Sequence, residues 1–230
     1  MSSLLSLFVA SRRPVGARRA GGGPARPPRP DQPGWPVRII LASQSPRRRE
    51  LLRRICSEFE VIPSAIEEVL EAWPTSAAVV SLALQKASAV AERVREGVVV
   101  AADTVVVIDD MVLGKPAGPD EARAMLVRLR GRQHEVLTGV ALVDAGSGRA
   151  VATAVVSRVL MAAYPGATIE EYVASGSPLD KAGAYAIQDL QGALVDAVVG
   201  SYTNVVGLPV EATRRLLAGF GVTVSERVEP

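Results

Sequence analysis

The feature that most limits the possible folds is the almost entirely apolar run from Val98 to Ile108. Such a run is typical of a strand covered on both faces, because a half-exposed strand alternates polar and apolar residues. Helical patterns precede and follow it, at 75–95 and 119–129, and a hairpin pattern occupies 135–161. Since strands, helices and a hairpin are mixed along the chain, we expect an α/β fold with a mixed sheet.

Asp103 stands in the middle of this run. An ionised carboxylate in apolar surroundings costs several kcal/mol unless it is paired with a cation or bound to a metal. One interpretation is a structural aspartate that accepts hydrogen bonds from backbone amides. The other is a functional carboxylate, either a metal ligand or the base that activates a water molecule. The run by itself leaves both interpretations open.

A second unusual stretch occupies residues 39–52. It begins as a short apolar strand, and Ser45-Pro46 then predicts a helix start, because serine is a good N-cap and proline suits the first helical position. The first turn carries three consecutive arginines, 47–49. These cations oppose the positive end of the helix dipole unless an anion binds there, and phosphate is a frequent ligand of helix N-termini. The pattern indicates a phosphate site, with solvated arginines as the alternative.

The amino-acid composition limits the size of the domain and the kinds of metal site that it can contain. With 230 residues, 48% of them hydrophobic, the chain can bury the core of one domain, including a domain with two lobes. The single cysteine, Cys56, excludes an intramolecular disulfide, and the single histidine, His134, is read as structural. A zinc site is therefore not expected, and a metal would be a hard cation on carboxylates. The sequence has no uncharged apolar run long enough to span a membrane.

Residues 1–36 differ from the rest of the chain. They contain six arginines, one aspartate and a Gly/Pro-rich stretch, without apolar periodicity, so we expect a disordered extension followed by one domain at 37–230. The extension carries +5 and the whole chain +2, which leaves −3 on the domain and argues against nucleic-acid binding. We expect a cytoplasmic protein, with organellar targeting by a transit peptide in residues 1–36 as an alternative.

Several segments resemble, in order, the sequence blocks of the Maf-family nucleoside triphosphate pyrophosphatases. The opening motif of that family is similar to residues 41–52, Leu-Ala-Ser-Gln-Ser-Pro-Arg-Arg-Arg-Glu-Leu-Leu. The other similar segments are 82–87, 101–104, 113–116, 131–139, 177–188 and 200–209. Two departures are Ala186, where the family often has glycine, and the run 188–192, which is one residue longer than the usual Gln-Gly-x-Gly.

This resemblance implies a two-lobed fold of the Maf and inosine-triphosphatase type with a central cleft. It implies hydrolysis of a nucleoside triphosphate to the monophosphate and pyrophosphate, as house-cleaning of nucleotide pools, with Mg²⁺ or Mn²⁺ as cofactor. The Ser-Pro-Arg-Arg opening is typical of the branch that prefers dTTP and UTP, and argues against an inosine-type triphosphatase. The alternative is a nucleotide-binding regulator of cell division or septum formation without significant turnover. A homodimer is compatible with either function.

The resemblance also implies roles for individual residues. Asp103 would be the proton acceptor, and Glu68 and Asp103 would hold the metal. Base selection would depend on Arg47, Thr104 and Gln188. The remaining substrate-binding residues would be Ser43, Arg48, Lys86, Lys115 and Lys181. Without the resemblance, Lys86 reads as a solvated helix residue and Lys115 as a surface lysine in a turn.

Overall fold

The computed structural model describes residues 7–10, 37–66 and 76–224. The strands are β1 (Leu7–Ala10), β2 (Ile39–Leu41), β3 (Glu60–Val61), β4 (Val98–Ile108), β5 (Met111–Leu113), β6 (Gln133–Asp144), β7 (Ala150–Met161) and β8 (Val195–Val199). The α-helices are α1 (Pro46–Arg53), α2 (Ser76–Ala91), α3 (Pro119–Leu129), α4 (Gly166–Ala174), α5 (Tyr202–Val206) and α6 (Val210–Ala218). Three 3-10 helices are η1 (Ser177–Asp180), η2 (Ala182–Ala184) and η3 (Asp189–Gly192). No helix in this described part is long and apolar enough to cross a membrane.

The strands form one sheet in the order β1-β7-β6-β4-β2-β3, with β5 paired to β4 and β8 paired to β7. β2 runs parallel to β3 and β4, whereas the pairs β4/β6 and β6/β7 are antiparallel. The prediction of an α/β fold with a mixed sheet is therefore confirmed. The expected hairpin is also present, as β6 and β7.

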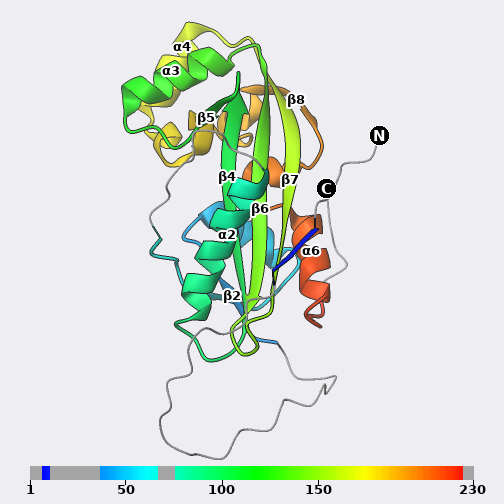
Figure 1. Ribbon diagram of the computed structural model, residues 1–230. Helices are drawn as coiled ribbons and strands as arrows, with labels where there is room; N and C mark the ends of the chain where they lie inside the picture. Colours follow the sequence, from blue (N-terminus) through cyan, green and yellow to red (C-terminus); the bar gives the residue numbers. More distant parts are fainter. Residues whose placement is uncertain (1–6, 11–36, 67–75, 225–230) are drawn as a thin grey trace, which may run out of the picture.

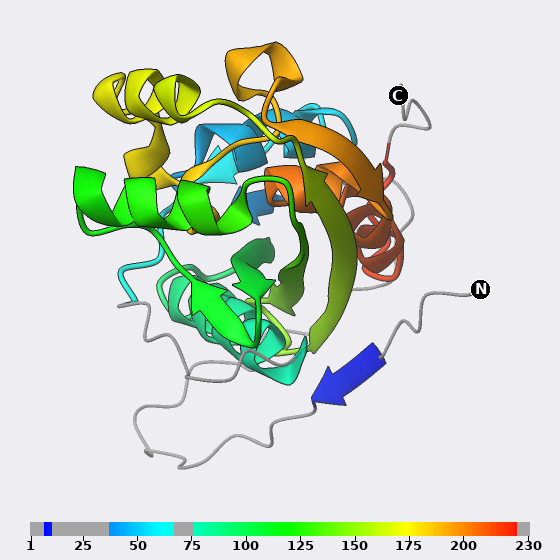
Figure 2. The same cartoon turned by 90° about the horizontal axis from the view of Figure 1, so that it is seen from above.

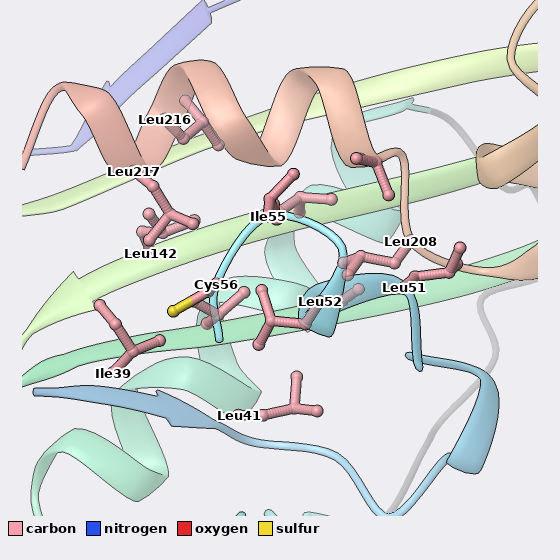
Figure 3. Packing of buried hydrophobic residues seen from close by; sticks show 14 of the residues in the cluster. Ile39, Leu41, Leu51, Leu52, Ile55, Cys56, Leu142, Leu208, Leu216 and Leu217 are labelled. Carbon is pink, nitrogen blue, oxygen red and sulfur yellow. The ribbon is translucent and has the colours of Figure 1, made fainter. Parts of the chain in front are cut away.

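Helices cover both faces of the first half of β4, as Figure 1 shows. Val99 and Ala101 belong to a buried cluster with α2, whereas Val98 and Val100 belong to a cluster with α1 and α6. Figure 3 shows the second cluster, in which leucines of α1 and α6 meet side chains of β2. Because neither face of this strand half contacts water, its residues do not alternate between polar and apolar.

One face of the second half of β4 belongs to another cluster, formed with α3 and α4. This cluster contains Val106 and Ile108 together with Leu126 and Leu129 of α3 and Ile169 of α4. Both helices lie at the end of the long strands away from β2, and Figure 2 views the molecule from that end. The fold thus has two lobes that share the same strands, which confirms the expected two-lobed architecture.

Gly139 of β6 permits a close approach of α2 to the sheet. It pairs with Asp103 across the ladder between β4 and β6. A Cβ added to Gly139 would lie 2.2 Å from the carbonyl oxygen of Val79 and 2.6 Å from the amide nitrogen of Val80, both in the backbone of α2. The helix backbone therefore rests directly on the strand, and only glycine leaves room for it.

β1 differs from the expectation that residues 1–36 form no structure. Its four residues pair antiparallel with β7, in register from Leu7 with Thr153 to Ala10 with Ala150. The physical reason is that an edge strand has unpaired backbone groups to which an extended apolar segment can add. The rest of the extension, 1–6 and 11–36, lies outside the described residues.

Candidate active site

A cleft of about 390 Å³ lies where the two lobes meet. This volume is within the usual range for small-molecule sites. Residues from both lobes line it, including the start of α1, the inner side of α2, the middle of β4 and the segment around η1 and η2. The predicted site residues that line it are Ser43, Arg47, Arg48, Lys86, Asp103, Thr104, Lys115 and Lys181.

The start of α1 has the local structure that its sequence predicts. Pro46 is the first helical residue, and the Ser45 hydroxyl accepts a hydrogen bond of 3.4 Å from the backbone amide of Arg48. The first turn of α1 carries no acidic residue. Its positive end, with Arg47 and Arg48, faces the cleft, an arrangement that attracts an anion.

Arg48 joins three segments of the cleft wall. Its Nε donates to the carbonyl oxygen of Gly207 at 2.9 Å, and its two terminal nitrogens donate to the hydroxyls of Ser43 at 3.4 Å and Thr104 at 3.2 Å. The Thr104 hydroxyl also lies 3.0 Å from the hydroxyl of Thr138 on β6. Arg48 therefore orders the wall as well as contributing positive charge to it.

Arg47 spans the cleft from one lobe to the other. Its Nη1 lies 3.5 Å from Asp180 Oδ2 of η1, and Lys181 Nζ donates to Asp180 Oδ1 at 2.7 Å. Burial of Asp180 opposes its ionisation, but the hydrogen bond from Lys181 and the charge of Arg47 hold its pKa below the usual value. Asp180 thus partly compensates two cations that a triphosphate could also contact.

Lys86 and Asp103 form a buried ion pair. Lys86 Nζ donates to Asp103 Oδ1 at 2.7 Å, and only 3% and 5% of the two residues are exposed. The reading of Lys86 as a solvated helix residue is therefore wrong. The helix pattern contained a signal for this, because Lys86 shares its face of α2 with Ala83, Ala87 and Val90, which are fully buried. The ammonium compensates the carboxylate that the apolar run of β4 would otherwise bury alone.

Of the two carboxylates that line the cleft, Asp103 and Asp180, Asp103 is the one expected to bind a divalent cation. Mg²⁺ in nucleotide sites is held by one or two carboxylates together with phosphate oxygens of the substrate, so a large cluster of protein ligands is not required. The described ranges contain no group of three or more His, Cys, Asp or Glu residues that could hold a metal. Glu68, the other expected ligand, lies outside those ranges.

Gln188 is the described candidate that does not line the cleft. It is exposed and immediately precedes η3, while Tyr185 and Ala186 of the same segment are cleft residues. The sequence reasoning missed Tyr185 as a wall residue, although it lies inside the segment 177–188 that resembles a family block. Its position there, next to Ala186, was the available signal.

Tyr185 rests on the buried histidine. His134 Nε2 lies 2.7 Å from the Tyr185 hydroxyl, and the two rings meet edge to face with centroids 5.4 Å apart. Burial lowers the pKa of His134 to about 4. The imidazole is therefore neutral at physiological pH, and it packs against Tyr185, which lines the cleft.

The buried histidine predicts a pH-dependent loss of stability. Its pKa is about 4 in the fold against 6.5 when unfolded, so the unfolded chain binds more protons between these values. The stability that the neutral His134 imidazole contributes is present above pH 6.5 and is lost as the pH falls from there towards 4. Between pH 7 and pH 5, the wild type should lose about 2 kcal/mol more unfolding free energy than His134→Gln, as measured by urea denaturation. Equal losses in the two proteins would contradict this role.

Comparison with known proteins extends over both lobes. Residues 38–220 match a family described as Maf-like protein. A protein from Gloeobacter violaceus named dTTP/UTP pyrophosphatase is 49% identical over 80% of this chain and 96% of its own length. Proteins of the same name from Moorella thermoacetica and Desulforamulus reducens are 48% and 46% identical, over 83% and 81% of this chain and 99% and 98% of their own lengths. The matched region contains all the residues that line the cleft.

Proposed function

This chain belongs to the Maf-like protein family, and from that premise we propose that it hydrolyses nucleoside triphosphates to the monophosphate and pyrophosphate, with dTTP and UTP as its best substrates. The observation that carries the proposal is the identity of 46–49% to proteins named dTTP/UTP pyrophosphatase over almost their whole lengths. The slightly acidic charge of residues 37–230 favours free nucleotides over nucleic acid as the substrate. The proposal places the protein in the cytoplasm, with the nucleotide pool.

The cleft offers positive charge to three phosphates from several directions. Arg47 and Arg48 stand at the start of α1, Lys115 follows β5, and Lys181 lies between η1 and η2. Phosphoryl transfer depends mainly on positioning and on neutralising charge, and these cations supply both. In the proposed complex, the triphosphate replaces Asp180 as the partner of Arg47.

In the proposal, Asp103 is the residue that acts on the attacking water. In the proposed reaction, the water oxygen attacks the α-phosphorus, Asp103 accepts a proton from that water, and the bond to the bridging oxygen breaks to release pyrophosphate. Lys86 keeps the Asp103 carboxylate oriented through their hydrogen bond of 2.7 Å. Asp103 and Glu68 would hold Mg²⁺ or Mn²⁺, which when bound neutralises charge on the phosphate oxygens.

A pyrophosphate-release screen over the canonical nucleoside triphosphates, with Mg²⁺ or Mn²⁺, tests the proposed function. We expect kcat/KM to be highest for dTTP and UTP and clearly lower for dCTP, dATP and dGTP. Gln188→Ala should reduce this preference more than it lowers the maximal rate, because an amide can both donate to and accept from the edge of uracil or thymine. Gln133→Ala, an exposed glutamine outside the cleft lining, is the matched control.

Two results of the screen would contradict the proposal. Equal kcat/KM values for dTTP and a purine triphosphate would exclude the preference for dTTP and UTP. Nucleotide binding without pyrophosphate release would instead support the regulator without turnover.

A further inference from the structure

The turn formed by residues 186–189 is held by hydrogen bonds to a buried tyrosine of α4. The Tyr172 hydroxyl donates to Asp189 Oδ2 and accepts a hydrogen bond of 3.3 Å from the amide of Ala186. The turn is also closed by its own backbone, since the amide of Asp189 donates to the carbonyl oxygen of Ala186 at 3.0 Å. Tyr172 is 2% exposed, so a single buried hydroxyl holds both ends of the turn that contains Gln188.

The backbone after this turn has a conformation that its residues do not favour. Leu190 and Gln191 have φ values of 49° and 55°, in the left-handed region that favours glycine. Leucine and glutamine adopt this region at a steric cost, which contacts around them have to offset. Asp189, directly before them, is held by Tyr172 and Lys181, and the amide of Ala193 donates to the carbonyl oxygen of Leu190 at 3.0 Å.

Asp189 also reaches a cation of the cleft. Its Oδ2 lies 3.6 Å from Lys181 Nζ, and the same ammonium donates to Asp180 and to the carbonyl oxygen of Ser177. Lys181 lines the cleft and is only 8% exposed. Asp189 therefore connects the turn on one side of Tyr185 and Ala186 with the cation on the other side.

We propose that Tyr172 and Asp189 are positioning residues that fix segment 185–188, of which Tyr185 and Ala186 line the cleft, and thereby set the base selectivity of the enzyme. The inference rests on the proposed function, since it concerns which nucleotide is preferred. Neither residue lines the cleft, so both act through Ala186 and Gln188. We refer to the two hydrogen bonds of the Tyr172 hydroxyl, with the Asp189 carboxylate and with the Ala186 amide, as the clamp.

The clamp should affect selectivity more than chemistry. If it is removed, the disfavoured backbone at Leu190 and Gln191 can relax and shift Ala186 and Gln188 relative to the bound base. A polar recognition site loses discrimination when its groups are displaced, even by about 1 Å. Asp103 and Lys86 stand on β4 and α2 and do not depend on this turn.

The test compares kcat/KM for dTTP and dCTP in the full-length protein. In Tyr172→Phe and Asp189→Ala we expect the ratio to fall about tenfold, mainly through a higher KM for dTTP, with kcat changed less than about threefold. Tyr164→Phe is the matched control: Tyr164 is another buried tyrosine of the same cluster, but its hydroxyl donates to the carbonyl oxygen of Leu126. It should leave the ratio unchanged.

Asp189→Asn separates the clamp from the ion pair. Asparagine keeps an oxygen that accepts from Tyr172 but removes the charge facing Lys181, so we expect it to retain most of the selectivity. The inference is overturned if Tyr172→Phe and Asp189→Ala keep the wild-type ratio, or if Tyr164→Phe lowers it equally. A ratio in Asp189→Asn as low as in Asp189→Ala would assign the effect to Lys181 and also overturn it.

Binding measurements keep this inference separate from the proposed function. The dissociation constants of α,β-methylene analogues of dTTP and dCTP, determined by calorimetry, should show the same loss of preference in the clamp variants. A wild type that prefers the dTTP analogue through the clamp but releases no pyrophosphate from dTTP contradicts only the proposed hydrolysis. Clamp variants that bind the two analogues with the wild-type ratio contradict the clamp, whether or not the enzyme turns over.

Discussion

Replacing Asp103 with asparagine should lower kcat for dTTP by about two to four orders of magnitude. The amide cannot accept the proton of the attacking water and is a weaker ligand for a divalent cation. The fold should survive, because the asparagine oxygen can still accept the hydrogen bond that Lys86 Nζ now donates to Asp103. Nucleotide binding should also survive, since Arg47, Lys115 and Lys181 are unchanged.

Steady-state kinetics and calorimetric binding of dTTP measure the two parts of this prediction. Asp196→Asn is the matched control, because Asp196 is an exposed aspartate of β8 outside the cleft lining. It should keep the wild-type kcat. Turnover of Asp103→Asn within about tenfold of the wild type would exclude Asp103 as the proton acceptor.

Replacing Gly139 with alanine should lower the free energy of unfolding by about 3 kcal/mol or more. The added methyl group would lie 2.2 Å from the Val79 carbonyl oxygen, and a backbone atom cannot move aside as a side chain can. α2 would have to shift away from the sheet, and Lys86 would move with it. We therefore expect a lower kcat as well, even at temperatures where the variant is folded.

Urea denaturation measures this change, and Gly166→Ala provides the control. Gly166 is the first residue of α4, and a Cβ there would meet no atom within 4 Å. That substitution should change stability by less than about 0.5 kcal/mol. A similarly small change in Gly139→Ala would mean that α2 can move without cost.

The elements that the sequence predicts well are those with local signals. β4 occupies the run at 98–108, because a nearly continuous apolar sequence is itself the signal of a strand that is largely buried on both faces. α1 begins where Ser45 and Pro46 place it, since a cap needs only neighbouring residues. β1 could not be expected in the same way, because its pairing depends on the free edge of β7, about 140 positions along the chain.

The contacts within the site were less predictable from the sequence than the elements of the fold. The resemblance to a family indicated eight of the residues that line the cleft, but not how they contact one another. The Arg47–Asp180 contact joins residues 133 positions apart, and no periodicity encodes it. Leu190 and Gln191 give no sequence signal of left-handed backbone either, because such residues adopt it only under constraint from contacts made elsewhere.

The long strands shared by both lobes determine how the cleft receives its ligand. β4 and β6 pair without interruption from Val98 with Asp144 to Val107 with Glu135, which passes from one lobe to the other. Rotation of one lobe against the other would have to bend or break that ladder, which limits how far the cleft can change width when a nucleotide binds. The nucleotide therefore binds to a largely preformed cleft, and little of the binding energy is spent on ordering the protein.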